Sequence, residues 1–164
     1  MVELRELDND AVALLAHFTY LAIYVPVGVA APPAAIVYEE PLLQAFFDNF
    51  GGRRGDLGLA AYEGDICTGA AWLRVIAGGY GHVDFEEIGD TPELAIAVEP
   101  EYRGLGIGTR LLIELFKLAT AKGWRQVSLS VQKENRAYAL YRRLGFKVFR
   151  DKGEDYLMLK QLRP

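Results

Sequence analysis

The chain has 164 residues, of which 51% are hydrophobic and 24% are charged, and its formal net charge is −4. This length and composition are typical of a single soluble domain over residues 1–164, large enough to bury a substantial core. The negative charge argues against nucleic acid as the main partner, because nucleic-acid binding usually needs a basic face. The single cysteine, Cys67, excludes an internal disulfide framework and a cysteine-based zinc site.

The N-terminal third predicts one strand and two helices. Residues 2–7 alternate apolar and charged side chains, as a half-exposed strand does. A helix is expected over residues 8–24, with Asp and Asn available to cap its start and a proline soon after its end. After a loop over residues 25–35, a second helix should cover residues 41–49, since it begins with a proline, which favours the first helical turn.

The middle of the chain predicts a hairpin, a loop and a buried strand. Residues 57–62 and 66–76 have strand-like compositions and are joined by a Glu-Gly-Asp turn. Residues 77–91 form a loop with four glycines. Acidic side chains gather in this loop and at the start of the next strand: Asp84, Glu86, Glu87, Asp90 and Glu93. Residues 94–98 are apolar on both faces, which indicates a strand buried on both sides.

The last part of the chain alternates helices and strands. The expected elements are a helix at 109–122, a strand at 126–132, a helix at 135–144 and strands at 146–150 and 156–160. Because a helix joins the strands at 92–98 and 126–132, these two should be parallel, with a right-handed crossover. The sequence therefore predicts an α/β (α+β) fold. Its mixed, mostly antiparallel sheet of about six to seven strands has helices on both faces and one parallel crossover pair.

The most informative stretch is the glycine-rich turn before the helix at 109–122. Its sequence is Glu99-Pro-Glu-Tyr-Arg-Gly-Leu-Gly-Ile-Gly-Thr109. The first amides of a helix have no partner within the helix, and the helix dipole favours an anion there. Glycine lets a phosphate approach the backbone closely. We therefore interpret Gly104, Gly106 and Gly108, with Arg103 beside them, as a phosphate cradle.

Other interpretations of this turn fit less well. A Rossmann fingerprint needs a third glycine where Thr109 stands, and a P-loop needs a lysine after its last glycine. A dinucleotide-binding fold of the Rossmann type is therefore a rival interpretation that lacks the third glycine and an acidic residue clearly placed for a ribose. A turn without any ligand is the other alternative, although three alternating glycines at a helix start cost stability.

A second motif, Glu134-Asn-Arg-Ala-Tyr-Ala-Leu-Tyr-Arg-Arg-Leu-Gly-Phe146, lies downstream. The glycine turn resembles the (Gln/Arg)-x-x-Gly-x-(Gly/Ala) loop of the GNAT acetyltransferase superfamily. The downstream motif resembles that family's Asn-x-Ala-x-x-Leu-Tyr-x-x-Leu-Gly-Phe sequence. The resemblance covers about residues 57–162 and implies the GNAT fold, in which the parallel strands part to hold acetyl-CoA. Residues 8–56 form the region that varies with substrate in such enzymes.

The resemblance also implies which residues contact acetyl-CoA. The strand backbone would bind the pantetheine arm, and the amides of the turn would hold the diphosphate, with the Arg103 side chain adding charge. Asn135 would contact the pantetheine arm, and Tyr141 would lie near the thioester sulfur. The implied set is Ile96, Ala97, Val98, Arg103, Gly104, Leu105, Gly106, Ile107, Gly108, Thr109, Asn135 and Tyr141. No metal is expected.

The predicted reaction is acetyl transfer from acetyl-CoA to a primary amine in a ternary complex, without an acyl-enzyme. Backbone N–H groups near Val98 could stabilise the oxyanion, and Tyr141 could protonate the leaving thiolate. An alkylamine is mostly protonated at neutral pH, so a base must remove its proton. Glu93 is the candidate base, with Glu86 and Glu87 as rivals. The acceptor is a small-molecule or protein amine.

Each assignment has a structural alternative. Tyr141 could simply pack in the core, and Glu93 could be a solvated carboxylate at a strand end. The acidic cluster could be a solvated loop or a funnel that attracts a cationic amine. His17 and His82 have no second ligand at metal spacing, and Cys67 suits a small core residue. The whole chain could also be a non-catalytic acyl-CoA-binding or sensing module.

Two expectations concern the setting of the protein. The first residues lack the basic and apolar regions of a signal peptide, and no apolar run approaches the ~20 residues of a membrane span. We therefore expect a cytoplasmic protein with no membrane partner. A homodimer could form through the last strands and the exposed parts of the N-terminal helices.

Overall fold

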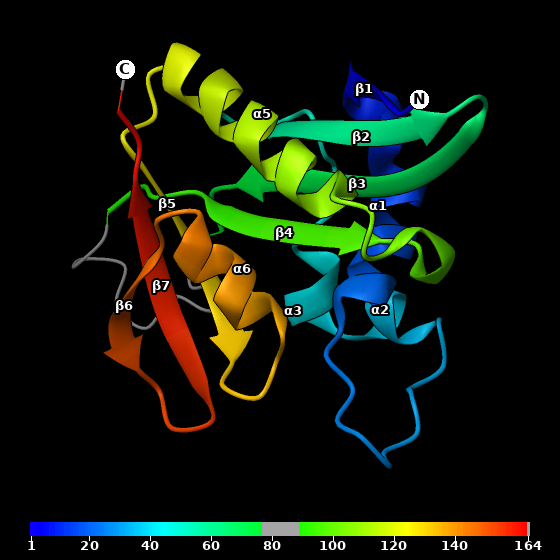
Figure 1. Cartoon of the computed structure of the whole chain (residues 1–164). Coiled ribbons are helices and arrows are strands. Elements are labelled where there is room, and N and C mark those ends of the chain that lie inside the picture. The colour runs from blue at the N-terminus through cyan, green and yellow to red at the C-terminus, as the bar shows by residue number, and fades with distance from the viewer. Residues whose placement is uncertain (77–88, 164) are drawn as a thin grey trace.

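The protein is built around one mixed sheet with helices on both faces (Figure 1). It is seen in a computed structural model that describes residues 1–76 and 89–163. Within these residues the strand order is β1-β2-β3-β4-β5-β7-β6. The strands are β1 (Glu3–Glu6), β2 (Leu57–Glu63), β3 (Ile66–Arg74), β4 (Glu93–Val98), β5 (Gln126–Gln132), β6 (Lys147–Asp151) and β7 (Asp155–Gln161). The α-helices are α1 (Val12–Ala22), α2 (Ile36–Glu39), α3 (Pro41–Gln44), α5 (Ile107–Ala121) and α6 (Ala137–Arg143).

The predicted sheet is confirmed. All neighbouring strands pair antiparallel except β4 and β5, which are parallel and joined through α5. Two helix starts also have the expected caps. Asp8 accepts a hydrogen bond from the Asp10 backbone N–H at 2.8 Å at the start of the 3-10 turn Asn9–Ala11, which leads into α1, and ahead of α6 Asn135 accepts one from the Ala137 N–H at 2.9 Å. These short-range signals fix where each helix begins because the cap needs only neighbouring residues.

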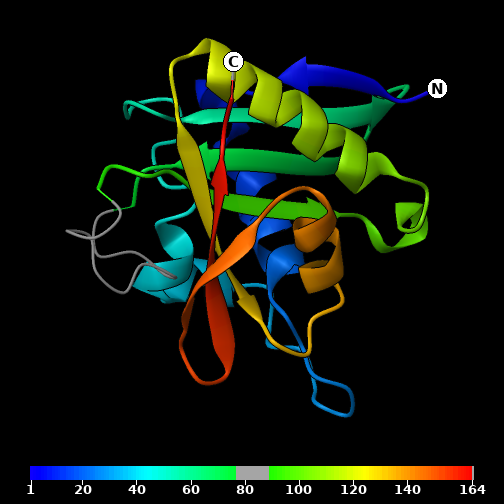
Figure 2. The same cartoon turned by 60° about the vertical axis from the view of Figure 1, so that its left-hand side comes forward.

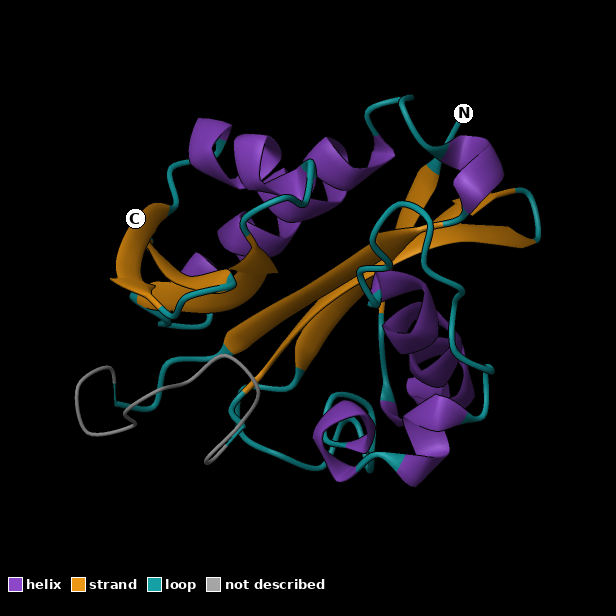
Figure 3. Ribbon diagram, turned by 90° about the horizontal axis from the view of Figure 1, so that it is seen from below, coloured by secondary structure: helices purple, strands orange, loops and turns teal. Residues whose placement is uncertain are grey.

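The helices form two layers, one on each side of the sheet (Figure 3). One core lies under α5 and α6, where Leu111 and Leu115 belong to the same cluster as Leu73 and Leu129 of the sheet. The other core lies under α1, α2 and α3; its buried residues include Leu15, Phe18, Phe50 and Trp72. Alternate residues of each strand therefore face different cores, as the period of two in a strand requires.

The predicted helix over residues 41–49 is wrong in its extent. The structure has two single-turn helices, α2 and α3, separated by Glu40, which is extended at φ −97° and ψ 113°. The residue before a proline is disfavoured in the helical region, and Pro41 follows. Beyond α3, backbone carbonyls serve buried side chains of β3: Trp72 Nε1 donates to Phe46 O at 2.8 Å, and Arg74 Nη1 donates to Asp48 O at 2.6 Å. Tertiary contacts thus shape this segment.

Part of the acidic cluster lies outside the described residues, namely Asp84, Glu86 and Glu87, and so does His82. In the portions that the structure does describe, no helix is both long and apolar enough to cross a membrane. The same portions contain no group of three His, Cys, Asp or Glu side chains arranged to hold a metal ion.

Candidate active site

The parallel strands β4 and β5 meet at only one end. Their register contains one pair, Glu93 with Ser128, reinforced by a hydrogen bond from the Ser128 N–H to Pro92 O at 2.9 Å. From that point the two strands diverge, as the green and yellow strands in Figure 2 show. The sheet therefore opens between β4 and β5 toward their carboxyl ends, which is where the glycine turn begins.

The backbone of β4 presents alternate residues to this opening. Glu99 N–H bonds to Thr68 O of β3 at 2.8 Å, whereas Pro92 O faces β5. Because backbone groups alternate sides along a strand, the N–H and C=O groups of Ile96 and Val98 point toward β5, as the carbonyl of Pro92 does. The groups of Ala97 point toward β3, where it pairs with Ala70. Two of the three predicted β4 residues thus offer their backbone to the opening.

Arg103 ties the glycine turn to the end of β4. Its Nε–H donates a hydrogen bond to the Val98 carbonyl at 2.9 Å, and the side chain is exposed. The carbonyl that it reaches is one of those that face the opening. In this position Arg103 fixes the path of the chain between the strand and the glycine turn.

The glycine turn has the geometry of an anion site. Gly104 and Gly106 adopt left-handed φ angles of +78° and +83°, and a Cβ at either position would meet no atom within 4 Å. Gly106 is the N-cap of the 15-residue α5 and supplies no side chain to its first amides. A helix N-terminus bordered by open space at two glycines fits a diphosphate. The turn residues Gly104, Leu105 and Gly106 are exposed, and Leu105 is 69% exposed.

The second motif places its residues along the other wall of the opening. Asn135 caps α6 and is half-buried, and Tyr141 lies on the buried face of α6 with 9% of its surface exposed. The Tyr141 ring packs edge-on against Phe146, with centroids 5.8 Å apart. Burial raises the pKa of the Tyr141 hydroxyl to about 12, so it stays protonated at neutral pH. Its protonated hydroxyl is therefore available as a proton donor.

Glu93 lies where β4 and β5 last touch, on the opposite face from Tyr141. It is the cross-strand neighbour of Arg74 and follows the alternation of Ala95 and Ala97, which belong to the core under α1. The residue is 2% exposed, so it is not the solvated carboxylate of the alternative interpretation. Burial raises the pKa of the Glu93 carboxyl well above its ordinary value, and the ammonium of Lys152 opposes that shift.

A contact between α1 and the end of β4 was not foreseen. His17 Nε2 lies 2.5 Å from Glu99 Oε1, although 82 residues separate them in sequence. This contact joins α1 to the residue that begins the glycine turn. A histidine in mid-helix and a glutamate after a strand give no local sign of such a contact, so the sequence alone could not pair them.

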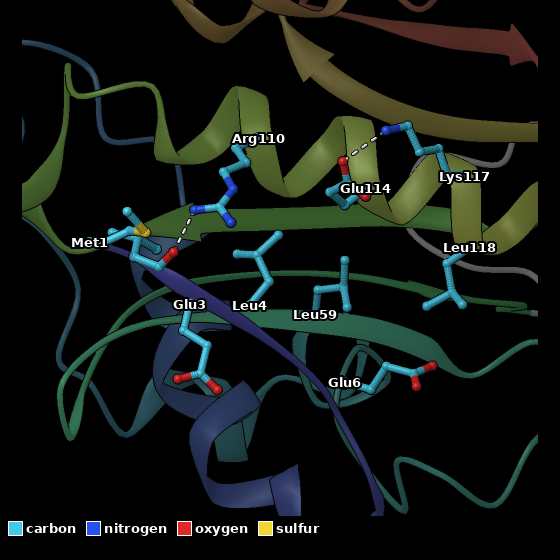
Figure 4. A pocket seen from close by; sticks show the side chains of 10 residues that line it. Met1, Glu3, Leu4, Glu6, Leu59, Arg110, Glu114, Lys117 and Leu118 are labelled. Atoms are coloured by element: carbon cyan, nitrogen blue, oxygen red, sulfur yellow. Dashed lines mark hydrogen bonds and ion pairs between the residues drawn. The ribbon is translucent and has the colours of Figure 1, made fainter.

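A separate groove lies elsewhere on the molecule. It lies between α5 and β1, and its walls include Leu4, Leu59 and Leu118 (Figure 4). At its edge Arg110 donates to the Val2 carbonyl, which fastens β1 to α5. None of the predicted contact residues for the cofactor lines this groove, so it is separate from the β4–β5 opening.

Comparison with solved structures identifies the class of fold. The N-acetyltransferase PaiA from Thermoplasma acidophilum in complex with coenzyme A matches over 98% of this chain and 99% of that one, with a TM-score of 0.69 and 24% identity. A putative acetyltransferase from Salmonella typhimurium with acetyl-CoA matches with a TM-score of 0.64 and 20% identity, over 100% and 95% of the two chains. These likenesses establish that the fold is that of GNAT acetyltransferases.

The sequence gives the family. The model of the acetyltransferase (GNAT) family matches residues 28–146, and the chain therefore belongs to that family. A spermidine N(1)-acetyltransferase of Thermoplasma acidophilum is 32% identical over 83 residues, which cover 49% of this chain and 52% of that protein. The matched segments span from 19% to 52% of the length of the curated relatives.

Proposed function

We propose that this chain, acting as a single domain over residues 1–164, is an acetyl-CoA-dependent N-acetyltransferase that acetylates a primary amine in a ternary complex. The observation that carries the proposal is the opening between β4 and β5. Backbone groups of Ile96 and Val98 face it, and the glycine turn at its mouth offers helix amides beside open space. A diphosphate on that turn would direct the attached arm between the two strands.

Each face of the opening would supply a different part of the reaction. The acceptor would approach from the α1 side, where Glu93 receives the proton that the amine loses. The nitrogen lone pair attacks the thioester carbonyl carbon, and the N–H of Ile96 or Val98 is placed to stabilise the oxyanion. As the C–S bond breaks, Tyr141 on the opposite face gives its proton to the departing thiolate, and after product release solvent returns a proton to Tyr141 while Glu93 gives up the one that it received. The raised pKa of Glu93 makes it a stronger base than an ordinary carboxylate.

The relatives support an amine acceptor without choosing one. One relative is named as a spermidine N(1)-acetyltransferase, and another as a mycothiol acetyltransferase from Thermobifida fusca.

Cytoplasmic localisation stays a prediction. A homodimer also stays a prediction. The edge strand β6 exposes Val148 and Phe149, which a second copy would cover. Light scattering at two protein concentrations tests for the dimer.

A thiol-release assay with acetyl-CoA and a panel of primary amines tests the proposal, with the acetylated product identified by mass spectrometry. Tyr141→Phe should lower kcat about 10²-fold, because general acid catalysis is lost. CoA affinity, measured by calorimetry, should be unchanged. Tight CoA binding with no turnover on any amine would instead favour a sensing module, which should be indifferent to the Tyr141 substitution.

A further inference from the structure

Helix α1 carries a buried hydroxyl that has no hydrogen-bond partner among residues 1–76 and 89–163. Thr19 is 4% exposed, and no donor or acceptor in these residues bonds its Oγ1 atom. A threonine in a helix can bond the carbonyl four residues earlier, as Thr120 of α5 does with Phe116 O at 2.7 Å. Burial without a partner is destabilising, because the hydroxyl loses its bonds to water. The unpaired hydroxyl of Thr19 therefore points to a ligand that supplies the missing bond.

Thr19 lies on the face of α1 that covers β4. It stands one turn after Ala16, which is 2% exposed and belongs to the same core as Ala97 of β4. The helix packs mainly against β4, and Figure 1 shows it behind β3 and β4. The contact between His17 and Glu99 fixes α1 near the end of that strand. The hydroxyl of Thr19 is therefore placed between the helix and β4, beside the opening.

The strip of β4 under α1 can be reached from the opening. On this side of the strand, Glu93 is followed by two alanines, Ala95 and Ala97, whose side chains fill little space. Ala95 is only half-buried, although it lies in the middle of β4. Trp72 of β3 borders Ala95 in the ladder, but on the opposite side β5 has parted from β4 beyond Ser128. A solute in the opening can therefore reach this strip, which begins at Glu93 and passes under α1.

A hydroxyl suits the form of an amine that reacts. A primary amine attacks only when it is neutral, and it then has a lone pair for the carbonyl carbon and N–H groups to donate. A hydroxyl oxygen accepts one such N–H, which fixes the direction of the lone pair. A carboxylate at the same place would instead hold the amine as an ammonium, which has no lone pair. Thr19 is uncharged, so it can bind the amine without keeping it protonated.

We propose that Thr19 is an acceptor-binding residue: its hydroxyl oxygen accepts a hydrogen bond from the N–H of the neutral amine and so directs the lone pair toward the thioester. The inference rests on the proposed function, because it assigns a contact on the acceptor side of the same opening. The bond supplied by the acceptor accounts for a buried hydroxyl that packing alone does not explain. The proton that the amine loses still passes to Glu93.

The test compares Thr19→Val, which keeps the shape of the side chain but not the hydroxyl, with Thr19→Ser, which keeps the hydroxyl but not the methyl group. Thiol release is measured with acetyl-CoA and butylamine, benzylamine or alaninamide. In Thr19→Val, kcat/KM should fall about tenfold, because one hydrogen bond to the attacking amine is lost. The melting temperature of this variant should not fall, since an unpaired polar group has left the core. Thr19→Ser should melt at a lower temperature and keep most of the wild-type kcat/KM.

Calorimetric titration of the CoA-bound protein with the same three amines measures the contact without requiring turnover. At about pH 9, where more of each amine is neutral than at pH 7, affinity for the amine should fall about tenfold in Thr19→Val. Thr19→Ser should keep the wild-type affinity, and CoA should bind all three proteins equally. General damage to the protein would not lower activity in the more stable variant and spare it in the less stable one.

Thr120→Val is the matched control, because it removes a helical hydroxyl whose partner lies within the protein. It should leave kcat/KM and amine affinity unchanged. Wild-type values of both quantities in Thr19→Val, or an equal loss in Thr19→Ser, would overturn the inference, and so would failure of all three amines to bind. Absence of thiol release by the wild-type protein would overturn the proposed function instead, and the calorimetric comparison would then decide the inference alone.

Discussion

The two faces of the sheet are covered by different kinds of structure. On one face the 15-residue α5 and the shorter α6 lie over an apolar core that contains Leu111, Leu115 and Leu129. On the other face α1 is followed by two single-turn helices and a run of turns up to residue 56. The first face carries the glycine turn and Tyr141, and the second carries Glu93 and Thr19.

The difference lies in what holds each layer. The helix α5 is held by a periodic apolar stripe, which is a short-range property of its sequence. The turns at 45–56 are held by Arg74, whose guanidinium is fully buried. It bonds Asp56 through Nε and Nη2 at 2.9 and 3.0 Å and also donates to the Ala45 and Asp48 carbonyls. The layer on the α1 side thus depends on the buried Arg74–Asp56 pair.

The largest loss of stability should come from Arg74→Met, which removes the residue that holds the turns at 45–56. Removing one partner leaves the Asp56 charge buried, so the free energy of unfolding should fall by about 3–5 kcal/mol, measured by urea denaturation. The control is Lys117→Met on α5, which breaks an exposed pair with Glu114 and should cost less than about 1 kcal/mol. Equal losses in the two variants would show that the irregular layer does not depend on this pair.

A smaller effect is expected on the cofactor face from Gly106→Ala. The new methyl group would project toward the phosphate position at a left-handed φ of +83°, so CoA affinity should fall at least tenfold. Gly123→Ala, at the other end of α5, imposes a similar strain at φ +94° and also meets no atom within 4 Å. Both variants should lose about 1 kcal/mol of stability. Calorimetry should find the affinity loss only in Gly106→Ala, and a loss in both would argue against the cradle.

The smallest effect is a pH dependence at Glu93. Because burial raises its folded-state pKa, the folded protein holds this proton more tightly than the unfolded chain does. Its contribution to stability is complete below the ordinary pKa of 4.5 and is lost as the pH rises through the raised value. The side chain of the Glu93→Gln variant does not titrate. The melting temperature of this variant, relative to that of wild type, should therefore increase as the pH rises from about 4. Scanning calorimetry across that range checks this, and a constant difference would contradict it.

The cofactor face could be predicted because its signals are local. The strand, the glycine turn and the helix are consecutive, so residues 94–121 reveal their own arrangement. Asn135 caps α6 from two residues away, and Tyr141 falls on its buried side by helical spacing. Burial of Glu93 could not be predicted, because it depends on neighbours from β3 and β5 that no short window contains.

The α1 side of the sheet could be predicted only in outline. The strand and the first helix were found, but the predicted helix over residues 41–49 stops at Gln44. The contacts that shape this side join distant residues: His17 with Glu99, Arg74 with Asp56, and Ser130 with Asp155. Single polar residues of these types occur throughout any soluble chain, so their pairing has no sequence signature.

By itself the sequence determined the order of the strands and helices along the chain, the parallel crossover and the place of the glycine turn. These follow from periodicity, glycines and caps, which act over a few residues. Only the tertiary structure decided where β4 and β5 part and which carboxylate is buried there. Those features depend on the packing of several strands and on the exclusion of water between them, and a one-dimensional pattern does not specify either.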